Sequence, residues 1–237
     1  SSAASDVYKR QIKYGSAVVM YQQFGETMEV VRDVCREMSA ELYVPDFDDI
    51  SVEFDSIDGQ VFSYRGASYA IPLLGEHQLH NAATVLEAVS VLRKLGWDID
   101  DEAVESGLYS VAWPARFEVL HTDDPWFVLD GGHNPQCAAA LRECLEHYFP
   151  DSKRVALVGV LKDKDYKSIA ATLAPLFDAC VCVTPPSERA LPAEELAELF
   201  KDSCREVCVA GTVEDGVDLA RDIAPVSYTH LRAHETS

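Results

Sequence analysis

Apolar positions near the start of the chain change from strand-like to helix-like spacing and back. Ala17–Tyr21 is a short apolar run of strand character, and Gly25–Ala40 carries apolar residues at helical spacing. Leu42–Val44 then returns to strand character. This β-α-β order is typical of a parallel sheet with a crossover helix.

The next segments follow a different pattern. Ile50–Ile71 has short apolar runs separated by glycine-containing turns, which predicts a small meander of hairpins. Leu74–Leu95 reads as a long amphipathic helix that ends at Gly96. Acidic residues from Asp100 onward suit the start of a second helix, since they face the positive end of its dipole.

Beyond Val111 the chain alternates between strands and helices, which predicts a doubly wound α/β domain. We place the domain boundary near Ser110–Trp113. The predicted strands are Phe117–His121, Trp126–Leu129, Arg154–Leu161, Ala179–Thr184 and Glu206–Ala210. The predicted helices are Pro135–Tyr148, Tyr166–Phe177, Ala193–Lys201 and Val213–Asp222.

Composition narrows the class of protein. The 237 residues are 48% hydrophobic, enough for one large or two small domains, and the formal net charge is −20. An acidic surface repels phosphate backbones, so we expect no nucleic-acid partner, although local cations can still hold a nucleotide. The seven cysteines include no C-x-x-C pair, which disfavours zinc and favours reduced core thiols in a cytoplasmic protein. No apolar run predicts a membrane span or a signal peptide.

Both ends of the chain look foreign to the rest. Residues 1–11 lack periodicity, and residues 226–237 follow a helix-like segment that stops abruptly. Both strings resemble translated adapter sequence, so we interpret them as non-native scars and exclude them from the fold. The i,i+4 pair His230 and His234 belongs to the second string and is not taken as a metal site.

The most informative segment runs from Leu129 to Pro135. An apolar strand ends there, Asp130 stands at its carboxyl end, and two glycines allow a tight turn before Asn134 caps the next helix. In open α/β sheets, ligands bind at the carboxyl ends of strands, so Asp130 and His133 are candidate site residues. A plain strand-turn-helix with a capping Asn and a surface His is equally compatible with the spacing.

The letters of Asp130–Pro135, DGGHNP, resemble the D-G-A-H-N-P signature of the folylpolyglutamate/dihydrofolate synthase family, within the Mur ligase superfamily. Further segments resemble family motifs in the same order: Ile12–Tyr21, Leu74–Ala83 (LGEHQLHNAA), Trp113–Glu118 (WPARFE) and Asp163–Asp165 (DKD). The resemblance implies the rear part of a central ATPase-type domain over residues 12–111. A truncated Rossmann-like C-terminal ligase domain would follow over residues 112–225.

Two loop positions and one motif depart from the family pattern. Ala115 stands where the family usually has glycine, and Gly132 where it usually has alanine. Because both exchanges are small for small, we expect the loops to keep their course. A Walker-type G-x-x-x-x-G-K-[ST] loop occurs nowhere in the sequence. In the family that loop lies upstream, with the magnesium ligands and a carbamylated lysine, so we expect a fragment that is inactive alone.

The resemblance also implies a reaction. ATP phosphorylates a substrate carboxylate, and the amino group of L-glutamate attacks the acyl phosphate to form an amide. The implied cofactors are ATP and Mg²⁺, and the implied partners are ATP, L-glutamate and dihydropteroate or a folate. We expect a cytoplasmic monomer of folate biosynthesis.

Four residues take roles by this resemblance. Arg116 would clamp the transferring phosphate, although an ion pair with Glu118 is the ordinary alternative. Asn81 would contact adenine unless its amide is satisfied locally. Asp130 would bind the ribose or nearby ATP groups. His133 would position or deprotonate the incoming amine.

Two competing interpretations stay open. Another Mur-type ligase of cell-wall synthesis is disfavoured by Asp130–Pro135, which those ligases do not share in this form. A non-catalytic nucleotide-binding module is favoured by the missing phosphate loop if the chain is taken literally. The pair His77 and His80 lacks an acidic third ligand, so we predict no metal there.

Overall fold

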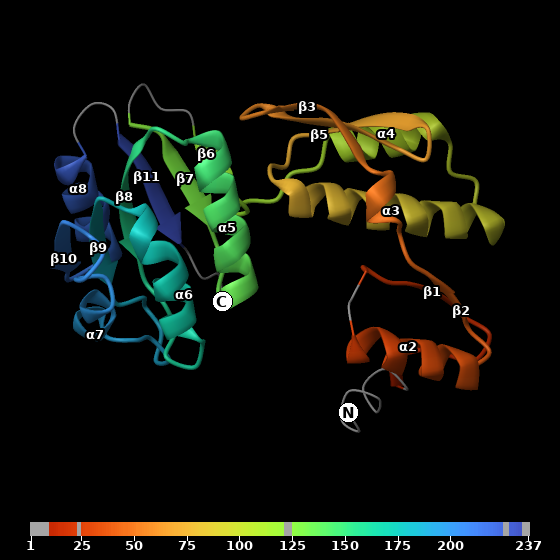
Figure 1. Ribbon diagram of the computed structural model, residues 1–237, viewed down its shortest axis with the longest axis horizontal. Coiled ribbons are helices and arrows are strands. Elements are labelled where there is room, and N and C mark those ends of the chain that lie inside the picture. Colours follow the sequence, from red (N-terminus) through yellow and green to blue (C-terminus); the bar gives the residue numbers. More distant parts are fainter. Residues whose placement is uncertain (1–9, 23–24, 121–124, 225–227, 234–237) are drawn as a thin grey trace. The chain divides into compact units, whose positions relative to one another are not determined.

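Figure 1 shows the computed structural model, which describes residues 10–22, 25–120, 125–224 and 228–233. The chain divides into two compact units between Val111 and Ala112. The division falls inside the stretch where the sequence pattern changes, and each unit has its own core.

The first unit opens with the predicted β-α-β segment. Strands β1 (Ala17–Val19) and β2 (Glu41–Tyr43) pair in parallel, and helix α2 (Glu26–Glu37) connects them. The apolar stripe of α2 packs on these strands because its spacing places the stripe on one face. The cluster contains Ile12, Val31, Val34 and Cys35, with Val18, Met20, Met38, Ala40 and Leu42 against it.

A meander and two helices complete the first unit. After the short 3₁₀ turn η1 (Phe47–Asp49), β3 (Ser51–Ser56), β4 (Gly59–Tyr64) and β5 (Ala67–Ile71) form an antiparallel sheet in the order β3-β4-β5. Helices α3 (Glu76–Lys94) and α4 (Asp101–Tyr109) follow, with Asp100 capping α4 as its acidic start predicts. The core joins β4 to α3 through Phe62, Tyr64, Leu79, Ala82, Ala83 and Leu86.

The second unit is built on one six-stranded sheet in the order β10-β9-β8-β11-β7-β6. Its strands are β6 (Glu118–Leu120), β7 (Phe127–Asp130), β8 (Lys153–Val158), β9 (Ala179–Val183), β10 (Glu206–Ala210) and β11 (Tyr228–Ala233). All neighbours are parallel except β6, which pairs antiparallel with β7 at the edge. The predicted end of the first of these strands, His121, lies outside the described residues.

Strand β11 is the element that the sequence pattern did not predict. It fills the position between β7 and β8 and pairs in parallel with both. Backbone groups make these hydrogen bonds, so a strand can form there without the apolar periodicity on which we relied. Our interpretation of residues 226–237 as a scar stays a prediction, because backbone pairing does not reveal where a segment comes from. Residues 1–9 of the other predicted scar lie outside the described part.

Helices α5 (Pro135–Tyr148), α6 (Tyr166–Leu173), α7 (Ala193–Glu198) and α8 (Val213–Ile223) connect the strands, as predicted. Figure 1 shows α5 and α6 in front of the sheet. The predicted helix Tyr166–Phe177 is shorter than expected: α6 ends at Leu173, and a 3₁₀ turn, η2 (Ala174–Leu176), follows. Pro175 explains the change because proline lacks the N–H of a continuing helix.

Strands β8 and β9 of the second unit are buried on both faces. Val155, Leu157, Val181 and Val183 pack with Ala220 of α8. The alternate residues Ala156, Cys180 and Cys182 are also buried. Burial of both sets is typical of a sheet covered by helices on each side.

All seven cysteines are free thiols, and five of them are buried, as predicted for core cysteines. Cys180 and Cys182 lie two residues apart on β9 with their sulfur atoms 3.7 Å apart. The hydrogen bond to Cys182 and burial raise the pKa of Cys180 well above its usual value. Burial also raises the pKa of Cys204 to about 11, so these thiols stay protonated and unreactive at neutral pH.

Arg154, the second residue of β8, is a buried cation with only 7% of its surface exposed. Its guanidinium donates to the carbonyl of Leu145 at 3.1 Å and to the carbonyl of Phe149, at the end of α5. Its backbone is tied to Asp178 in both directions, at 3.0 and 2.9 Å. Arg154 therefore satisfies the last carbonyls of α5, where a positive charge is favoured.

Candidate nucleotide and phosphoryl-transfer site

The candidate site forms where β7 ends and α5 begins. β7 ends at Asp130, one residue beyond the predicted end at Leu129, and α5 begins at Pro135, as the sequence predicts. The Asn134 side chain caps α5 by accepting from the backbone N–H of Cys137 at 2.9 Å. Proline suits the first helical position because no intrahelical acceptor exists for an N–H there. Residues 131–133 are thus held between a fixed strand end and a capped helix.

Asp130 joins this loop to the segment before β6. It is 9% exposed, and its Oδ2 accepts from the backbone N–H of Phe117 at 3.0 Å. Its Oδ1 accepts from Gly132 N–H at 2.7 Å. A further bond links the backbone N–H of Gly131 to the carbonyl of Ala115 at 2.9 Å. Two sequence motifs that start 17 residues apart, at Trp113 and Asp130, therefore form one structure.

The loop around Arg116 has an unusual backbone. Ala115 and Phe117 both have positive φ, at 56° and 44°, a region that costs a residue with a Cβ about 1–2 kcal/mol. The N–H of Ala115 donates to Glu118 Oε2 at 2.9 Å, which helps to hold this conformation. The glycine for which Ala115 substitutes would adopt this backbone without the steric cost.

Arg116 itself is half-buried, and its guanidinium is not neutralised by an acid. Its Nη1 donates a long hydrogen bond to the carbonyl of Ala115, at 3.4 Å. Among the described residues no carboxylate pairs with it. The ordinary alternative of an ion pair with Glu118 is therefore not what the structure has, because Glu118 accepts from the backbone instead.

His133 is half-buried and oriented by its own loop. Its Nδ1 lies 3.2 Å from the carbonyl oxygen of Gly131. Because a carbonyl can only accept, Nδ1 carries the hydrogen in this contact. In the neutral ring Nε2 then keeps its lone pair, so that atom can accept a proton.

Gly132 is more tightly packed than a small-for-small exchange with alanine suggests. A Cβ built on Gly132 would lie 2.7 Å from Asp130 Oδ1 and 2.9 Å from the Cβ of Cys137. Both distances are shorter than ordinary contacts between such atoms. The loop keeps its course, but the exchange of alanine for glycine is not neutral here, because this backbone leaves no space for a methyl group.

Asn81, the fourth predicted site residue, lies on α3 in the first unit. Its side chain is exposed beside the buried stripe, and its Nδ2 donates to Gln78 Oε1 at 3.1 Å. This bond occupies one donor of the amide and leaves its carbonyl oxygen uncommitted in the described contacts. The structure therefore shows the local partner that was the alternative, without using the whole amide.

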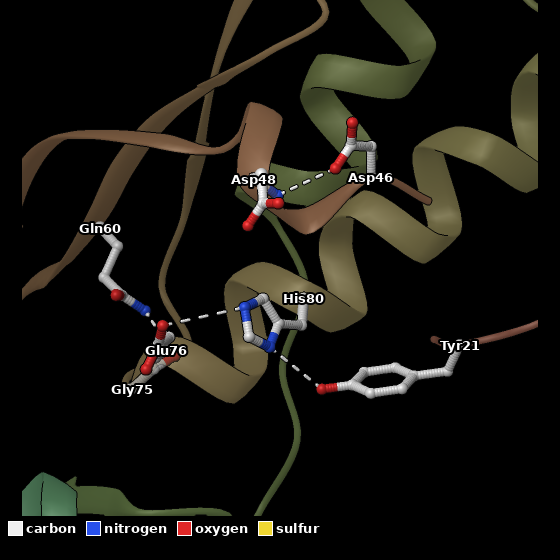
Figure 2. Close-up of polar contacts among 7 residues, drawn as sticks. All are labelled: Tyr21, Asp46, Asp48, Gln60, Gly75, Glu76 and His80. Atoms are coloured by element: carbon white, nitrogen blue, oxygen red, sulfur yellow. Dashed lines mark hydrogen bonds and ion pairs between the residues drawn. The ribbon is translucent and has the colours of Figure 1, made fainter. Parts of the chain in front are cut away.

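An aromatic cluster that sequence reasoning missed lies next to Asn81 on the same helix. His80 stacks on Phe47 with ring centres 4.1 Å apart, and its Nδ1 lies 3.1 Å from the hydroxyl of Tyr21. Figure 2 shows His80 between Tyr21 and Glu76, whose Oε1 is 3.9 Å from His80 Nε2. Burial, and secondarily Glu76, raises the pKa of Tyr21. No local sequence pattern predicts this cluster, because its members come from three separate segments of the chain.

The backbone before α3 is held by a buried side chain, that of Gln60, which Figure 2 also shows. The buried side chain of Gln60 donates from Nε2 to the carbonyls of Leu73 and Gly75, at 2.7 and 3.3 Å. Gly75 adopts φ 95° as the residue before the helix. A buried amide thus fixes the start of the helix that carries Asn81.

The Asp163–Asp165 segment forms a tied loop after β8. Asp165 caps α6 by accepting from Ser168 N–H at 3.2 Å. Asp163 pairs with Arg189 at 3.1 Å, and the N–H of Lys162 donates to the carbonyl of Arg189 at 2.8 Å. The motif therefore stabilises the contact between the loop after β8 and the loop that contains Arg189.

The described residues offer neither a cluster of metal ligands nor a membrane-spanning helix. No group of three or more His, Cys, Asp or Glu side chains that could hold a metal ion occurs among them. Within the same residues, no helix has both the length and the apolar character needed to cross a membrane.

Comparison with known proteins connects this geometry to a family. Residues 115–227 match the family described as "Mur ligase, glutamate ligase domain", which spans both loops of the site in the second unit. Over these residues the chain matches a Mur ligase domain, and it is similar over most of its length to folylpolyglutamate/dihydrofolate synthases. The resemblance that the motifs suggested is thereby confirmed.

The relatives are similar over most of this chain. It is 35% identical over 179 residues to the dihydrofolate synthase/folylpolyglutamate synthase of Mycobacterium tuberculosis, covering 71% of this chain and 36% of the relative. The solved M. tuberculosis folylpolyglutamate synthase, complexed with ADP and AMPPCP, has a TM-score of 0.79 and 31% identity, covering 92% of this chain and 52% of that one.

A second solved relative is a bifunctional folylpolyglutamate/dihydrofolate synthase with Mn, AMPPNP and L-glutamate bound. Its TM-score is 0.74 and its identity 25%, covering 96% of this chain and 53% of that one. The predicted α/β fold, with a Rossmann-like ligase domain, is confirmed by these likenesses. The present chain spans only about a third to a half of the length of these relatives.

Proposed function

We propose that this chain is part of an ATP-dependent ligase that adds L-glutamate to dihydropteroate or to a folate. The reaction would pass through an acyl phosphate, whose phosphate leaves when the glutamate amine attacks. The observation that carries the proposal is the joined pair of loops. Asp130 and Gly131 bond to the residues on both sides of Arg116, which fixes a half-buried cation that no described carboxylate neutralises.

Arg116 is proposed to hold the transferring phosphoryl group. A planar guanidinium can grip two phosphate oxygens, and its fixed charge stabilises the charge that develops on them. The positive φ on each side supports this role, since strained backbone is often kept where it positions a functional side chain. The relatives solved with ADP, AMPPCP and AMPPNP support a nucleotide ligand. Its proposed position follows from the fold, because ligands of open α/β sheets bind at the carboxyl ends of strands.

Asp130 and His133 take the supporting roles. Asp130 lies at the carboxyl end of β7, where ligands of open α/β sheets bind, and its carboxylate is proposed to accept from ribose hydroxyls. His133 Nε2 can accept a proton from the ammonium group of the incoming glutamate. The neutral amine that results can then attack the acyl phosphate and form the amide bond. Asn81 is proposed to contact adenine with its remaining amide groups.

Magnesium is not assigned to any residue of this chain. The family implies Mg²⁺, but the described residues offer no cluster of ligands for it, so no step is derived through it here. One relative was solved with Mn and AMPPNP, which supports a divalent ion in the complete enzyme. The buried thiols support the further proposal of a cytoplasmic location, where cysteines stay reduced.

The experiment extends the chain upstream by a segment that carries a phosphate-binding loop and measures glutamate-dependent phosphate release. Dihydropteroate and tetrahydrofolate are the two acceptors. We expect Arg116→Ala to lower kcat/KM by at least about 100-fold, the scale of one lost transition-state contact. Arg142→Ala, which removes an exposed arginine of α5, is the matched control and should stay within about twofold.

The possible outcomes distinguish the proposed ligase from the second candidate function. A kinetically silent Arg116→Ala would remove that residue from the site. Absence of glutamate-dependent phosphate release with both acceptors would favour the second candidate, a non-catalytic nucleotide-binding module. The 237-residue chain alone should be inactive because its sequence contains no phosphate-binding loop. Ligase activity of the pure chain would therefore contradict our prediction that catalysis needs such a loop.

A further inference from the structure

A cavity of about 450 Å³ lies in the first unit, within the size range of small-molecule sites. It is bounded by the second half of α3, the β4–β5 hairpin and α4. Leu86 and Val89 of α3 and Val104 of α4 supply apolar walls. None of the residues used in the proposed function lines it.

Of the two tyrosines in these walls, Tyr69 can offer its hydroxyl to a ligand, whereas the hydroxyl of Tyr64 is itself buried. Tyr64 is 2% exposed, and its hydroxyl is a buried group without a hydrogen-bond partner among the described residues. A buried hydroxyl that stays unsatisfied is costly, so it calls for a partner or an explanation. Burial chiefly raises the pKa of Tyr69, which also lines the cavity, so that phenol stays protonated at neutral pH and can donate.

Three cations line the cavity although the chain carries a net charge of −20. Arg65 pairs with the buried Glu87 at 2.7 Å, and Arg93 pairs with Asp101 at 2.8 Å. Lys94 has a cation–π contact, with Nζ 4.7 Å from the centre of the Tyr43 ring, and no carboxylate pairs with it in the described residues. Acids neutralise the two arginines, and Asp49 and Glu105 add negative charge nearby, so Lys94 is the cation of these walls that remains available to an anion.

The two arginines are held in place before any ligand arrives. Arg65 occupies the β4–β5 turn with φ 51°, and its backbone N–H donates to Asp49 Oδ2 at 2.9 Å. Arg93 Nε donates to the carbonyl of Ile99 at 2.7 Å. Groups fixed in this way lose little freedom on binding, which favours affinity.

We propose that this cavity binds a small aromatic carboxylate. The ring would lie against Leu86, Val89 and Val104, and the carboxylate would face Lys94 and the outer N–H groups of the two arginines. A purely apolar ligand would leave the cations unused, and an inorganic anion would leave the apolar walls unfilled. The combination therefore selects an anion with an apolar body.

The test uses salicylate and its neutral counterpart salicylamide as probes on the 237-residue chain. Backbone amide resonances are followed by NMR at low ionic strength. We expect saturable shifts confined to residues 64–69, 86–94 and 104, with salicylate binding about tenfold more tightly than salicylamide because a charged hydrogen bond is lost in the amide.

Variants separate this site from non-specific binding. Lys94→Gln should weaken salicylate about tenfold, and Val89→Phe should abolish binding by filling the cavity. Lys167→Gln, an exposed lysine of α6, makes the same charge change elsewhere and should have no effect. Arg65 is left intact because its loss would strand the buried charge of Glu87.

The proposal is overturned if salicylate gives no saturable shifts, if salicylamide binds equally well, or if Lys167→Gln weakens binding as much as Lys94→Gln. Dispersed amide spectra of each variant establish that it is folded. The outcome does not depend on ligase activity, so it is separate from the test of the proposed function.

Discussion

Two buried charges of the second unit, Asp130 and Arg154, are stabilised by the same kind of partner. Both bind to the backbone: the carboxylate accepts from backbone N–H groups, and the guanidinium donates to backbone carbonyls. They also act near opposite ends of α5. Asp130 orders the loop before its start, and Arg154 satisfies the carbonyls at its end.

The two regions differ in what the surrounding loops present. Near Asp130, Arg116 and His133 are half-buried and keep functional atoms uncommitted. Around Arg154, the guanidinium donates to backbone carbonyls, and the backbone N–H donates to the Asp178 carboxylate. The comparison teaches that a buried charge is not itself a sign of a site. What distinguishes the proposed site is a fixed charge beside side-chain atoms of Arg116 and His133 that remain available to a ligand.

Arg154→Met should have the largest effect on stability. The substitution removes the charged donor from the carbonyls of Leu145 and Phe149, which keep only their backbone donors, and we expect this to lower the free energy of unfolding by about 3 kcal/mol. Urea unfolding measures this. The imidazole NMR signals of His133 should not move in the folded protein, because Arg154 acts at the other end of the helix.

The control for that prediction is Arg142→Met on the same helix. It removes an exposed pair with Glu146, at 3.0 Å, and should cost less than about 0.5 kcal/mol. If the two variants were equally stable, the end of α5 would not depend on Arg154. If His133 signals shifted in Arg154→Met, the separation between the two regions would be wrong.

Asp130→Asn comes next. An amide can offer one acceptor oxygen to Phe117 and Gly132 but not two, so one buried N–H loses its partner at a cost of about 2 kcal/mol. Urea unfolding gives the cost, and faster hydrogen exchange of the Phe117 or Gly132 amide identifies the broken bond. Unchanged exchange at both amides would show that Asp130 does not join the two loops.

Gly132→Ala tests how tightly the loop is packed. The new methyl group would meet Asp130 Oδ1 and Cys137 Cβ at distances under 3 Å, so we expect a loss of about 1–2 kcal/mol. Gly107→Ala, where a Cβ meets nothing within 4 Å on α4, is the control and should not destabilise. A neutral Gly132→Ala would mean that the loop shifts readily to accept the residue that its relatives usually carry.

Ala115→Gly should have the smallest effect and the opposite sign. Glycine relieves the positive φ but adds freedom to the unfolded chain, so a net stabilisation of about 0.5 kcal/mol is expected. Thermal unfolding is the measurement, and Ala139→Gly on the exposed side of α5 should destabilise by about 1 kcal/mol. Equal losses in both variants would show that Ala115 carries no backbone strain.

The sequence by itself determined much of this protein. Apolar spacing predicted the meander, the long helix and the strand–helix alternation because local periodicity follows from backbone geometry. The ordered motifs identified the family and pointed to Arg116, Asp130 and His133. The capping of α5 by Asn134 was also predictable, since its chemistry lies within four residues.

Only the tertiary structure decided the rest. It placed β11 between β7 and β8, assigned Glu118 to a backbone N–H rather than to Arg116, and showed that Gly132 has no space for a Cβ. It also brought Tyr21 and Phe47 to His80, and three cations to one cavity. These features depend on contacts between distant segments. Such contacts are set by the packing of the whole unit, and no local spacing encodes them.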